Sequence, residues 1–308
     1  MIGEAVIQAL KGYTEEKNIR LEEPMGGRTT FRVGGPADCL LEIHDKEELR
    51  KICRYLRLTS IPFFVMGNGS NLLVSDKGFR GVILQVCQGM NGIRVDGKRI
   101  IAQAGATLAQ VARTAMEHGL TGMEFASGIP GTVGGGIVMN AGAYGGEMSQ
   151  VVVSVEVLSP EGEFWTLDNE TMEFGYRKSS IRGHEYIVTE AEFELQEGDP
   201  AQIKAVMDGL NARRREKQPL EYPSAGSTFK RPEGRFAGEL IMNAGLRGFQ
   251  IGGAQVSEKH CGFIVNTKPG ETTAAEVMEV IRKTQESVME KFDVKLEPEV
   301  VFVGEFNK

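Results

Sequence analysis

Nine of the 25 residues from position 122 to position 146 are glycine, and this run constrains the fold more than any other part of the sequence. Glycine is the most flexible residue in the unfolded chain, so ordering such a run costs much conformational entropy. A protein accepts that cost where side chains would block the close approach of a flat or extended ligand. Apolar residues at 129, 133 and 137 interrupt the glycines and favour a buried ligand wall over the alternative, a flexible surface loop.

A second glycine-rich segment, Gly67-Asn68-Gly69-Ser70-Asn71, follows the apolar run PFFVM at 62–66, which predicts a buried strand. Successive backbone N–H groups in such a loop can point into one concavity and hold a phosphate or diphosphate. A tight turn after the strand is the alternative. Leu72 stands where G-x-G-x-x-G has its third glycine, and the sequence contains no Walker A motif, so the two commonest nucleotide-binding motifs are absent.

Hydrophobic periodicity predicts an α+β chain in three parts. Residues 1–75 contain a strand at 37–43, a helix with a capping box at Asp45 and Glu48, and the strand at 62–66. Residues 76–198 contain a strand at 81–86, a hairpin around Asp96-Gly97, a helix that begins at Thr107, and three alternating strands up to residue 195.

The third part, residues 199–297, begins with a helix at Asp199-Pro200, where proline suits the first helical position. Its apolar face is predicted from the spacing of Ile203, Val206, Met207 and Leu210. A second helix, capped by Thr273 and Glu276, ends this part. A last strand at 299–304, within residues 298–308, is predicted to return to the first part.

The charge balance limits the possible partners. There are 35 basic and 42 acidic residues, a net charge of −7. A dedicated nucleic-acid binder or a binder of anionic membranes needs a basic face, so we expect neither partner. No apolar run approaches the roughly 20 residues of a membrane-spanning helix, and the first residues include an acid where a signal peptide has basic residues. We therefore expect a cytoplasmic protein.

The cysteines and histidines are scattered. Cys39, Cys53, Cys87 and Cys261 form no C-x-x-C pair, and their spacing suits neither a zinc site nor a disulfide framework. The four histidines form no H-E-x-x-H pair. We expect free thiols in a reducing compartment and no metal site.

Four further positions carry side chains that could do chemistry. Ser227 lies in PSAGSTFK, where it is either a reactive hydroxyl or a hydroxyl that satisfies a turn; the motif is not G-x-S-x-G. Arg177 and Glu297 are each either a surface charge or part of a site. The basic run 213–215 with Lys217 is either a solvated helix face or a clamp on a polyphosphate.

Taken together, these segments resemble the UDP-N-acetylenolpyruvoylglucosamine reductase family, the flavoenzymes of bacterial peptidoglycan precursor synthesis. The resemblance runs from residue 29 to residue 300, and eight motifs in the same order carry it. They are TTFRVGGPAD (29–38), GNGSNLLV (67–74), GIPGTVGGG (128–136), MNAGAYGGE (139–147), FGYRKSSIR (174–182), SAGSTFKRP (224–232), AQVSEKHCGFIVN (254–266) and LEPEV (296–300).

The resemblance implies a fold and a set of site residues. The fold is α+β: an FAD-binding fold of the vanillyl-alcohol-oxidase type, made of two α/β subdomains, plus a separate α/β substrate-binding domain. The catalytic residues would be Arg177, Ser227 as proton donor, and Glu297. The substrate contacts would be Lys217, Arg214 and Tyr144. The residues that bind FAD would be Gly67, Asn68, Gly69, Ser70, Asn71, Gly128, Ile129, Pro130, Gly131, Gly134, Gly135, Asn140, Gly142 and Ala143.

The resemblance also has limits along this chain. The segment between Arg177 and Tyr186 is short, so the chain resembles the subclass that lacks an inserted loop with a tyrosine over the nucleotide. Some family members have asparagine at the position of Arg231, so the contact made by that asparagine is not assigned to this chain.

The implied reaction is the reduction of an enolpyruvyl ether by FAD, with NADPH as co-substrate, in a monomer. The cofactor carries the hydride chemistry, while Arg177 and Glu297 stabilise developing negative charge and Ser227 supplies a proton. Glu297 is the competing proton donor. Two other functions stay open: another FAD oxidoreductase of this fold that acts on an alcohol, or a flavin- or UDP-sugar-binding module without turnover.

Overall fold

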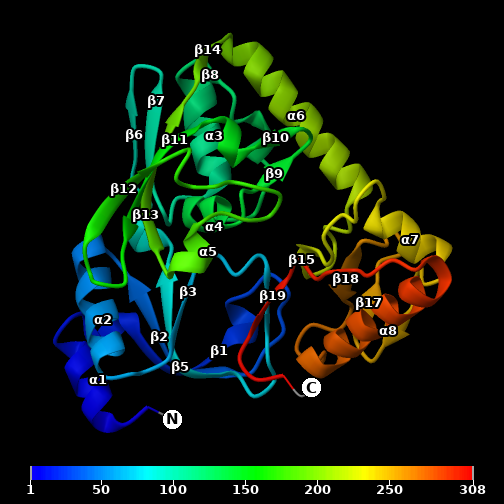
Figure 1. Cartoon of the computed structure of the whole chain (residues 1–308), viewed down its shortest axis with the longest axis horizontal. Coiled ribbons are helices and arrows are strands. Elements are labelled where there is room, and N and C mark those ends of the chain that lie inside the picture. Colours follow the sequence, from blue (N-terminus) through cyan, green and yellow to red (C-terminus); the bar gives the residue numbers. More distant parts are fainter. Residues whose placement is uncertain (1, 307–308) are drawn as a thin grey trace. The chain divides into compact units, whose positions relative to one another are not determined.

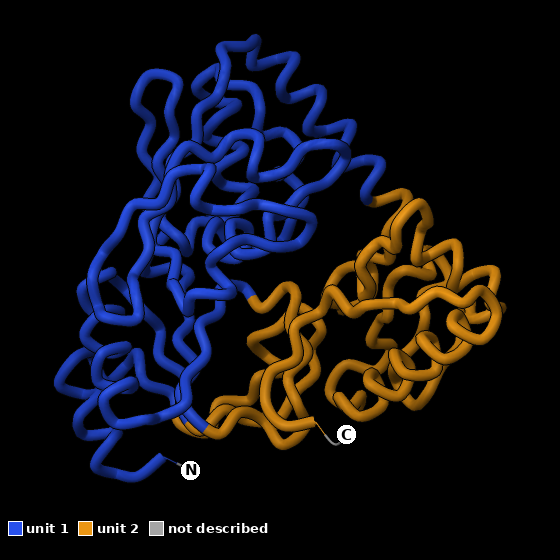
Figure 2. The backbone as a smooth tube through the Cα atoms, viewed as in Figure 1, with its two compact units in different colours: residues 1–20, 39–68, 81–214 blue, residues 21–38, 69–80, 215–308 orange. Residues whose placement is uncertain are grey.

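The computed structural model describes residues 2–306. The chain packs into two compact units, which Figure 2 shows in two colours. Unit 1 consists of residues 1–20, 39–68 and 81–214, and unit 2 of residues 21–38, 69–80 and 215–308. Each unit buries a hydrophobic core of its own. The three-part division by residue ranges stays a prediction.

A four-stranded sheet, most of whose residues lie in unit 1, follows the short first helix α1 (Glu4–Lys11). Its strand order is β1 (Ile19–Pro24), β2 (Pro36–Ile43), β5 (Phe79–Val86) and β3 (Phe63–Met66), and β3 runs parallel to β5. Helix α2 (Lys46–Leu58) has the predicted cap, since the Asp45 carboxylate accepts the N–H of Glu48 at 2.8 Å. The Glu48 carboxylate, however, accepts from His44 rather than from Asp45.

A five-stranded antiparallel sheet forms the other layer of unit 1 (Figure 1). The predicted hairpin is confirmed, with Gly97 in the left-handed region at φ +58° between β6 and β7. The predicted helix start at Thr107 is also confirmed, and Thr107 and Gln110 form a capping box there. The strand order is β12 (Phe164–Asp168), β11 (Val152–Leu158), β13 (Ile187–Glu194), β7 (Arg99–Gln103), β6 (Ile93–Asp96), and α3 spans Leu108–Glu117.

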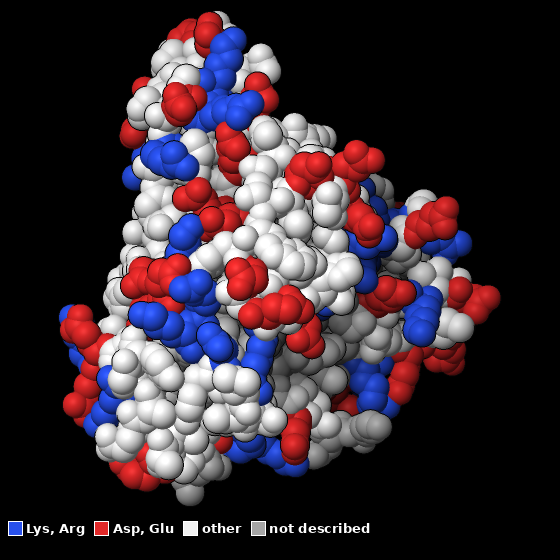
Figure 3. Space-filling model, turned by 60° about the vertical axis from the view of Figure 1, so that its left-hand side comes forward, with Lys and Arg blue, Asp and Glu red and all other residues white. Residues whose placement is uncertain are grey.

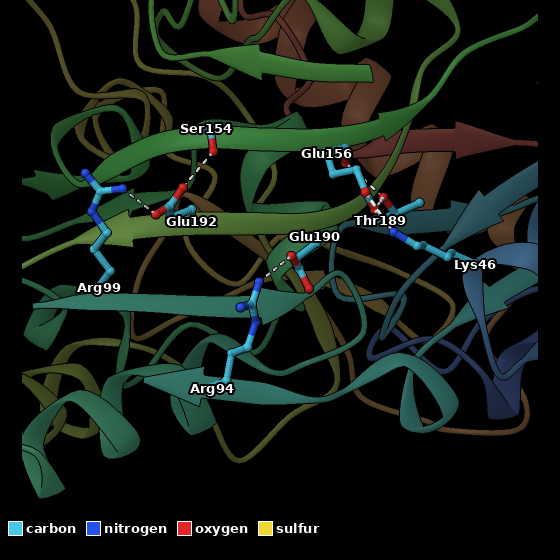
Figure 4. A network of polar contacts seen from close by, with 8 residues as sticks. All are labelled: Lys46, Arg94, Arg99, Ser154, Glu156, Thr189, Glu190 and Glu192. Atoms are coloured by element: carbon cyan, nitrogen blue, oxygen red, sulfur yellow. Dashed lines mark hydrogen bonds and ion pairs between the residues drawn. The ribbon is translucent and has the colours of Figure 1, made fainter. Parts of the chain in front are cut away.

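One face of this sheet carries a network of ion pairs (Figure 4). Glu156 and Glu190 lie directly opposite each other on antiparallel strands, where two like charges repel. Lys46 bonds to Glu156 at 2.7 Å and Arg94 to Glu190 at 3.4 Å, so each carboxylate has its own cation. Further contacts join Arg99 to Glu192, Ser154 to Glu192 and Thr189 to Glu156.

Helix α6 (Pro200–Lys217) begins at the predicted proline. Its predicted apolar face is wrong in part, because Ile203 is buried whereas Val206 is 50 % exposed. Polar residues occupy most of the helix surface, so the buried face of α6 is narrower than the predicted apolar face.

The shorter elements of unit 1 are α4 (Val133–Val138), α5 (Ile181–His184), the paired strands β8 (Leu120–Thr121) and β14 (Gln196–Glu197), the paired strands β9 (Gly142–Ala143) and β10 (Gly146–Glu147), and 3₁₀ turns at Glu16–Asn18, Gln88–Met90, Glu124–Ala126 and Met148–Gln150.

Unit 2 is built on a second four-stranded sheet and helix α8 (Ala274–Phe292), which has the predicted capping box of Thr273 and Glu276. The last strand, β19 (Val301–Val303), pairs in parallel with β4 (Leu72–Val74). The remaining elements are β15 (Ser224–Ser227), β18 (Phe263–Asn266), β17 (Ala254–Val256) and β16 (Gln250–Ile251), in that order in the sheet, helix α7 (Ala237–Asn243), and a 3₁₀ turn at Met25–Gly27.

Asp76 caps helix α8 from a loop nearly 200 positions away. Its two carboxylate oxygens accept the N–H groups of Ala274 at 2.7 Å and Ala275 at 2.9 Å. A helix start leaves N–H groups without partners and favours negative charge. We expect Asp76→Ala to lower the free energy of unfolding by about 1–2 kcal/mol. Denaturant titration measures this; the exposed Asp208→Ala should change little, and equal losses in both variants would contradict the capping role.

The charge distribution and the cysteines complete the description. On the face in Figure 3, basic side chains are interspersed with acidic ones. Within residues 2–306, no helix has both the length and the apolar character needed to cross a membrane. Three cysteines are buried and Cys87 is half-buried, and none of these four described residues is in a disulfide. Burial raises the pKa of the Cys53 thiol to about 12.

Candidate active site

The start of the 67–71 loop packs tightly against the glycine-rich run in unit 1. A Cβ atom on Gly67 would lie 2.3 Å from the hydroxyl oxygen of Thr132, so no larger residue fits without movement. The Asn68 side chain donates to the carbonyl of Pro130 at 3.1 Å. The Cys87 thiol in turn donates to the Asn68 side-chain oxygen at 3.4 Å. Two of the predicted FAD loops are therefore neighbours.

The rest of the loop belongs to unit 2 and contacts the segment that follows Glu297. Gly69 has φ +63°, which suits glycine, and its carbonyl accepts from the N–H of Thr30. The Asn71 side chain donates to the carbonyl of Glu299 at 3.1 Å, and the Asn71 carbonyl accepts from Val301 at 2.9 Å. Ser70 is half-buried beside them.

The glycines between residues 122 and 146 differ in their surroundings. Most meet protein atoms: a Cβ on Gly128 would lie 2.5 Å from the Asn211 side chain, and one on Gly142 would lie 2.6 Å from the carbonyl of Gly146. Gly135 and Gly145 are exposed and face open space or nearly so. The middle of the run forms helix α4, which the sequence reasoning missed because glycine disfavours helices.

Arg177 lies in unit 1 at the tip of a tight turn. Gly175 and Lys178 exchange backbone hydrogen bonds of 3.1 and 3.2 Å across it, and Arg177 has φ +56°, where glycine is usual. The guanidinium lies over the ring of Tyr176, 5.1 Å from its centre, and donates to the carbonyl of Gly142 at 3.4 Å. The structure thus brings Arg177 to the segment of the predicted FAD residues Gly142 and Ala143.

Asn140 joins this turn to the glycine-rich run. Its side chain is buried, donates to the carbonyl of Gly175 at 3.2 Å and accepts from the N–H of Ser149 at 2.9 Å. Both ends of the amide are therefore used within the protein.

The predicted substrate residues Tyr144 and Arg214 lie near each other in unit 1. Burial lowers the pKa of the Arg214 guanidinium, and the nearby Tyr144 opposes this shift. Arg213, predicted only as a member of the basic run 213–215, has its guanidinium over the Tyr144 ring, 5.5 Å from the centre. Tyr144 is 43 % exposed and has φ +55°. Such a cationic, aromatic pair can bind an anionic or planar group.

Ser227 and Glu297 come from two neighbouring antiparallel segments of unit 2. Phe229 and Pro298 form a β-bridge, the N–H of Lys230 donates to the carbonyl of Glu297 at 2.9 Å, and both predicted catalytic side chains are exposed. The Lys230 ammonium lies 3.2 Å from the Glu297 carboxylate. The sequence reasoning missed Lys230, because only the folded pairing brings it to Glu297.

A pocket of about 540 Å³ lies beside the end of helix α6 in unit 2. Lys259 links the two, since its ammonium donates to the carbonyl of Arg215 at 2.8 Å. Lys217, the predicted diphosphate contact, is exposed and ends α6. The sequence reasoning missed the pocket itself, which is lined by Glu221, Tyr222, Arg247, Gln255, Ser257, Glu258, Lys259 and Val265.

His260 and Cys261 directly follow the pocket residue Lys259 in the chain. Burial lowers the pKa of His260, and its ring accepts the N–H of Gly262 at 3.1 Å. Burial raises the pKa of the Cys261 thiol. Burial thus favours the uncharged form of both groups. Within residues 2–306, no three His, Cys, Asp or Glu side chains gather as a metal site.

Comparisons with known proteins identify the family. Residues 37–168 match the FAD binding domain model, and residues 218–303 match UDP-N-acetylenolpyruvoylglucosamine reductase, C-terminal domain. The curated UDP-N-acetylenolpyruvoylglucosamine reductase of Caldanaerobacter subterraneus subsp. tengcongensis is 51 % identical over 304 residues, which cover 99 % of this chain and 100 % of that protein. The chain belongs to this family. The reductase of Clostridioides difficile is 49 % identical and covers 96 % of this chain and 97 % of its own length.

Solved structures agree with the family. The UDP-N-acetylenolpyruvylglucosamine reductase of Thermus caldophilus has a TM-score of 0.79 at 36 % identity and covers 92 % of this chain and 98 % of its own. Phl p 4.0202, a glucose dehydrogenase, has a TM-score of 0.50 at 13 % identity over 70 % of this chain and 51 % of its own, a likeness of fold alone. The predicted α+β fold with a vanillyl-alcohol-oxidase-type FAD-binding part is confirmed.

The residues present fit FAD. Gly67 packs against Thr132, so the two glycine-rich segments lie side by side in unit 1, and Gly135 leaves its side of α4 open. Neither 67–71 nor 128–136 contains an acidic residue, so a diphosphate can approach either segment without repulsion. In the second segment, the N–H groups of Ile129, Val133, Gly134 and Gly136 already donate to backbone carbonyls.

Proposed function

We propose that this protein catalyses the FAD-dependent, NADPH-driven reduction of the enolpyruvyl group of UDP-N-acetylglucosamine enolpyruvate, which gives UDP-N-acetylmuramate for peptidoglycan synthesis. The observation that carries the proposal is the 51 % identity to a curated reductase over 99 % of this chain. Through its product the enzyme would serve cell-wall biogenesis, cell shape and division. We further propose that it works in the cytoplasm as a monomer, with no nucleic-acid or membrane partner.

The loops 67–71 and 128–135, with residues 140–143, would hold FAD. When bound, FAD supplies hydride to the terminal carbon of the enolpyruvyl group. The protein's own groups would then handle charge and protons. The Arg177 guanidinium would stabilise the negative charge that spreads into the substrate carboxylate. The carboxyl group of Glu297 would donate a hydrogen bond to the substrate carboxylate. Alternatively, the Lys230 ammonium would balance the negative charge of Glu297.

Ser227 would donate a proton to the neighbouring carbon of the substrate. A serine hydroxyl is a weak acid, but a carbanion-like carbon is a strong base. The difference in acidity that opposes proton transfer is therefore smaller than it would be for a weaker base. Glu297, the competing donor, has its carboxylate 3.2 Å from the Lys230 ammonium. Because Lys230 already engages Glu297, we assign the proton to Ser227.

We place the nucleotide end of the substrate at the pocket beside α6. Tyr222, an exposed aromatic residue, offers a ring for the uracil base, while Lys259 and Arg247 offer positive charge for the diphosphate. This arrangement would serve in place of the tyrosine loop that the chain lacks. The residue ranges 1–75 with 298–308, 76–198 and 199–297 remain our proposed domains.

Lys217→Ala is expected to raise the Kd for the UDP-sugar about 10-fold and to change the rate of hydride transfer less than 3-fold. The lysine would act as a point charge on the diphosphate and not on the reacting carbon. Calorimetry of the oxidised protein gives the Kd. Lys204→Ala, which removes an exposed lysine of the same helix paired with Asp208, is the matched control. An unchanged Kd in the Lys217 variant would reject the assignment.

The function itself is tested with the purified yellow protein. NADPH should bleach the flavin absorbance without oxygen, and UDP-N-acetylglucosamine enolpyruvate should restore it with formation of the lactyl ether. Bleaching by an alcohol with recovery in oxygen would favour another oxidoreductase of this fold. Bound flavin without any turnover would favour a binding module.

A further inference from the structure

The turn that carries Arg177 is strained and needs an anchor. Arg177 occupies the third position of the turn between Gly175 and Lys178 with φ +56°. An L-residue other than glycine, asparagine or aspartate adopts this conformation at a cost of about 1 kcal/mol or more. Contacts with the surroundings must therefore keep the turn in place.

Two hydrogen bonds tie this turn to the last residue of helix α4 and to Asn140 just after it. On the entry side, the Asn140 amide donates to the carbonyl of Gly175, the same carbonyl that closes the turn with the N–H of Lys178. On the exit side, the Ser179 hydroxyl donates to the carbonyl of Val138 at 3.0 Å. The anchor is thus built from residues 138–140, within the glycine-rich run that carries predicted FAD residues.

Asn140 itself is fixed in a way that suits an anchor. It is 1 % exposed, its oxygen accepts from the N–H of Ser149, and its φ of +42° is one that asparagine tolerates well. A buried amide with both ends bonded holds its partners in one geometry. On the other side of the turn, the Arg177 guanidinium reaches the carbonyl of Gly142, two residues after Asn140.

We propose that Asn140 is a positioning residue that holds the Arg177 turn, and with it the guanidinium, against the flavin-binding run. The expected effect of Asn140 on turnover rests on the proposed function. The anchoring of the turn is a property of the chain alone.

The test uses Asn140→Gly, which removes the amide and keeps the positive φ accessible. Hydrogen–deuterium exchange of the peptide 172–180 should rise at least 5-fold in both flavin-free and flavin-loaded protein. Flavin reoxidation by the enolpyruvyl substrate, measured in the FAD-saturated protein, should slow 10- to 100-fold. Asn140→Asp, which keeps the acceptor for Ser149 and loses the donor, is the second variant and should also raise the exchange.

Asn169→Ala is the matched control. The Asn169 amide donates to the carbonyls of Ser149 and Val152, so the variant loosens the same neighbouring segment without touching the Arg177 turn. It should change neither the exchange of 172–180 nor the reoxidation rate. In an Arg177→Lys background, Asn140→Gly should slow reoxidation less than 3-fold further, because the two changes act through one group.

Unchanged exchange of 172–180 in both Asn140 variants would overturn the proposal, as would an equal rate loss in the Arg177→Lys background. If Arg177→Lys itself leaves reoxidation at the native rate, the proposed function of Arg177 fails. The exchange measurement still decides whether Asn140 anchors the turn.

Discussion

Ser227→Ala is expected to lower the rate of flavin reoxidation by the enolpyruvyl substrate 100- to 10,000-fold and to leave flavin reduction by NADPH nearly unchanged. A positioned general acid contributes about this factor, and the first half-reaction needs no proton from the serine. Stopped-flow absorbance of the flavin separates the two half-reactions. Because Ser227 is exposed at the end of β15, the loss of its hydroxyl should leave stability unaltered.

Two variants control this experiment. Ser224→Ala removes a hydroxyl from the same strand, where it accepts a weak hydrogen bond from Gly226, and should reoxidise at the native rate. Ser227→Cys retains an acidic proton at the same place and should recover part of the rate. Normal reoxidation in Ser227→Ala would assign the proton to another group, with Glu297 the first to examine.

Gly67→Ala is expected to raise the Kd for FAD 10- to 100-fold and to lower the free energy of unfolding. The new Cβ would lie 2.3 Å from the Thr132 hydroxyl oxygen and 3.1 Å from its methyl group, so the loops at 67–68 and 130–132 must separate. Overpacking of this kind costs about 1–3 kcal/mol. Titration of the flavin-free protein with FAD, followed by fluorescence quenching, measures the effect.

The same contact supplies the rescue variant. Thr132→Ala removes the hydroxyl and the methyl group and leaves only a Cβ contact of 3.2 Å. The double variant should therefore bind FAD within about 3-fold of the Thr132→Ala protein. If the second substitution restores nothing, the loss arises from Gly67 itself and not from the packing of the two loops.

Elements with strong local signals could be predicted from the sequence. The helix starts at Thr107 and Thr273, the hairpin at Gly97 and the strand of β2 depend on neighbouring residues, and all four are confirmed. Helix α4 could not be predicted, because three consecutive glycines oppose a helix and only tertiary packing, such as Gly136 against Leu108, compensates.

The candidate site shows the same division between local and long-range information. Ser227, Arg177 and Glu297 lie in recognisable motifs, and these assignments stay predictions. The groups that hold them come from elsewhere in the chain: Asn140 reaches the Arg177 turn across 35 residues, and Lys230 reaches Glu297 across 67 residues. Such pairings depend on how the chain folds back, and no periodicity or motif encodes them.

The core of unit 2 has a consequence for the newly made polypeptide. This core joins Phe31 and Leu73 to Val300, so its first apolar residues emerge from the ribosome long before their last partner. At about 5–20 residues per second, the 227 positions from 73 to 300 correspond to a wait of roughly 10 to 45 s. During translation these residues stay uncovered, and nascent chains of this protein should depend on chaperones to avoid aggregation.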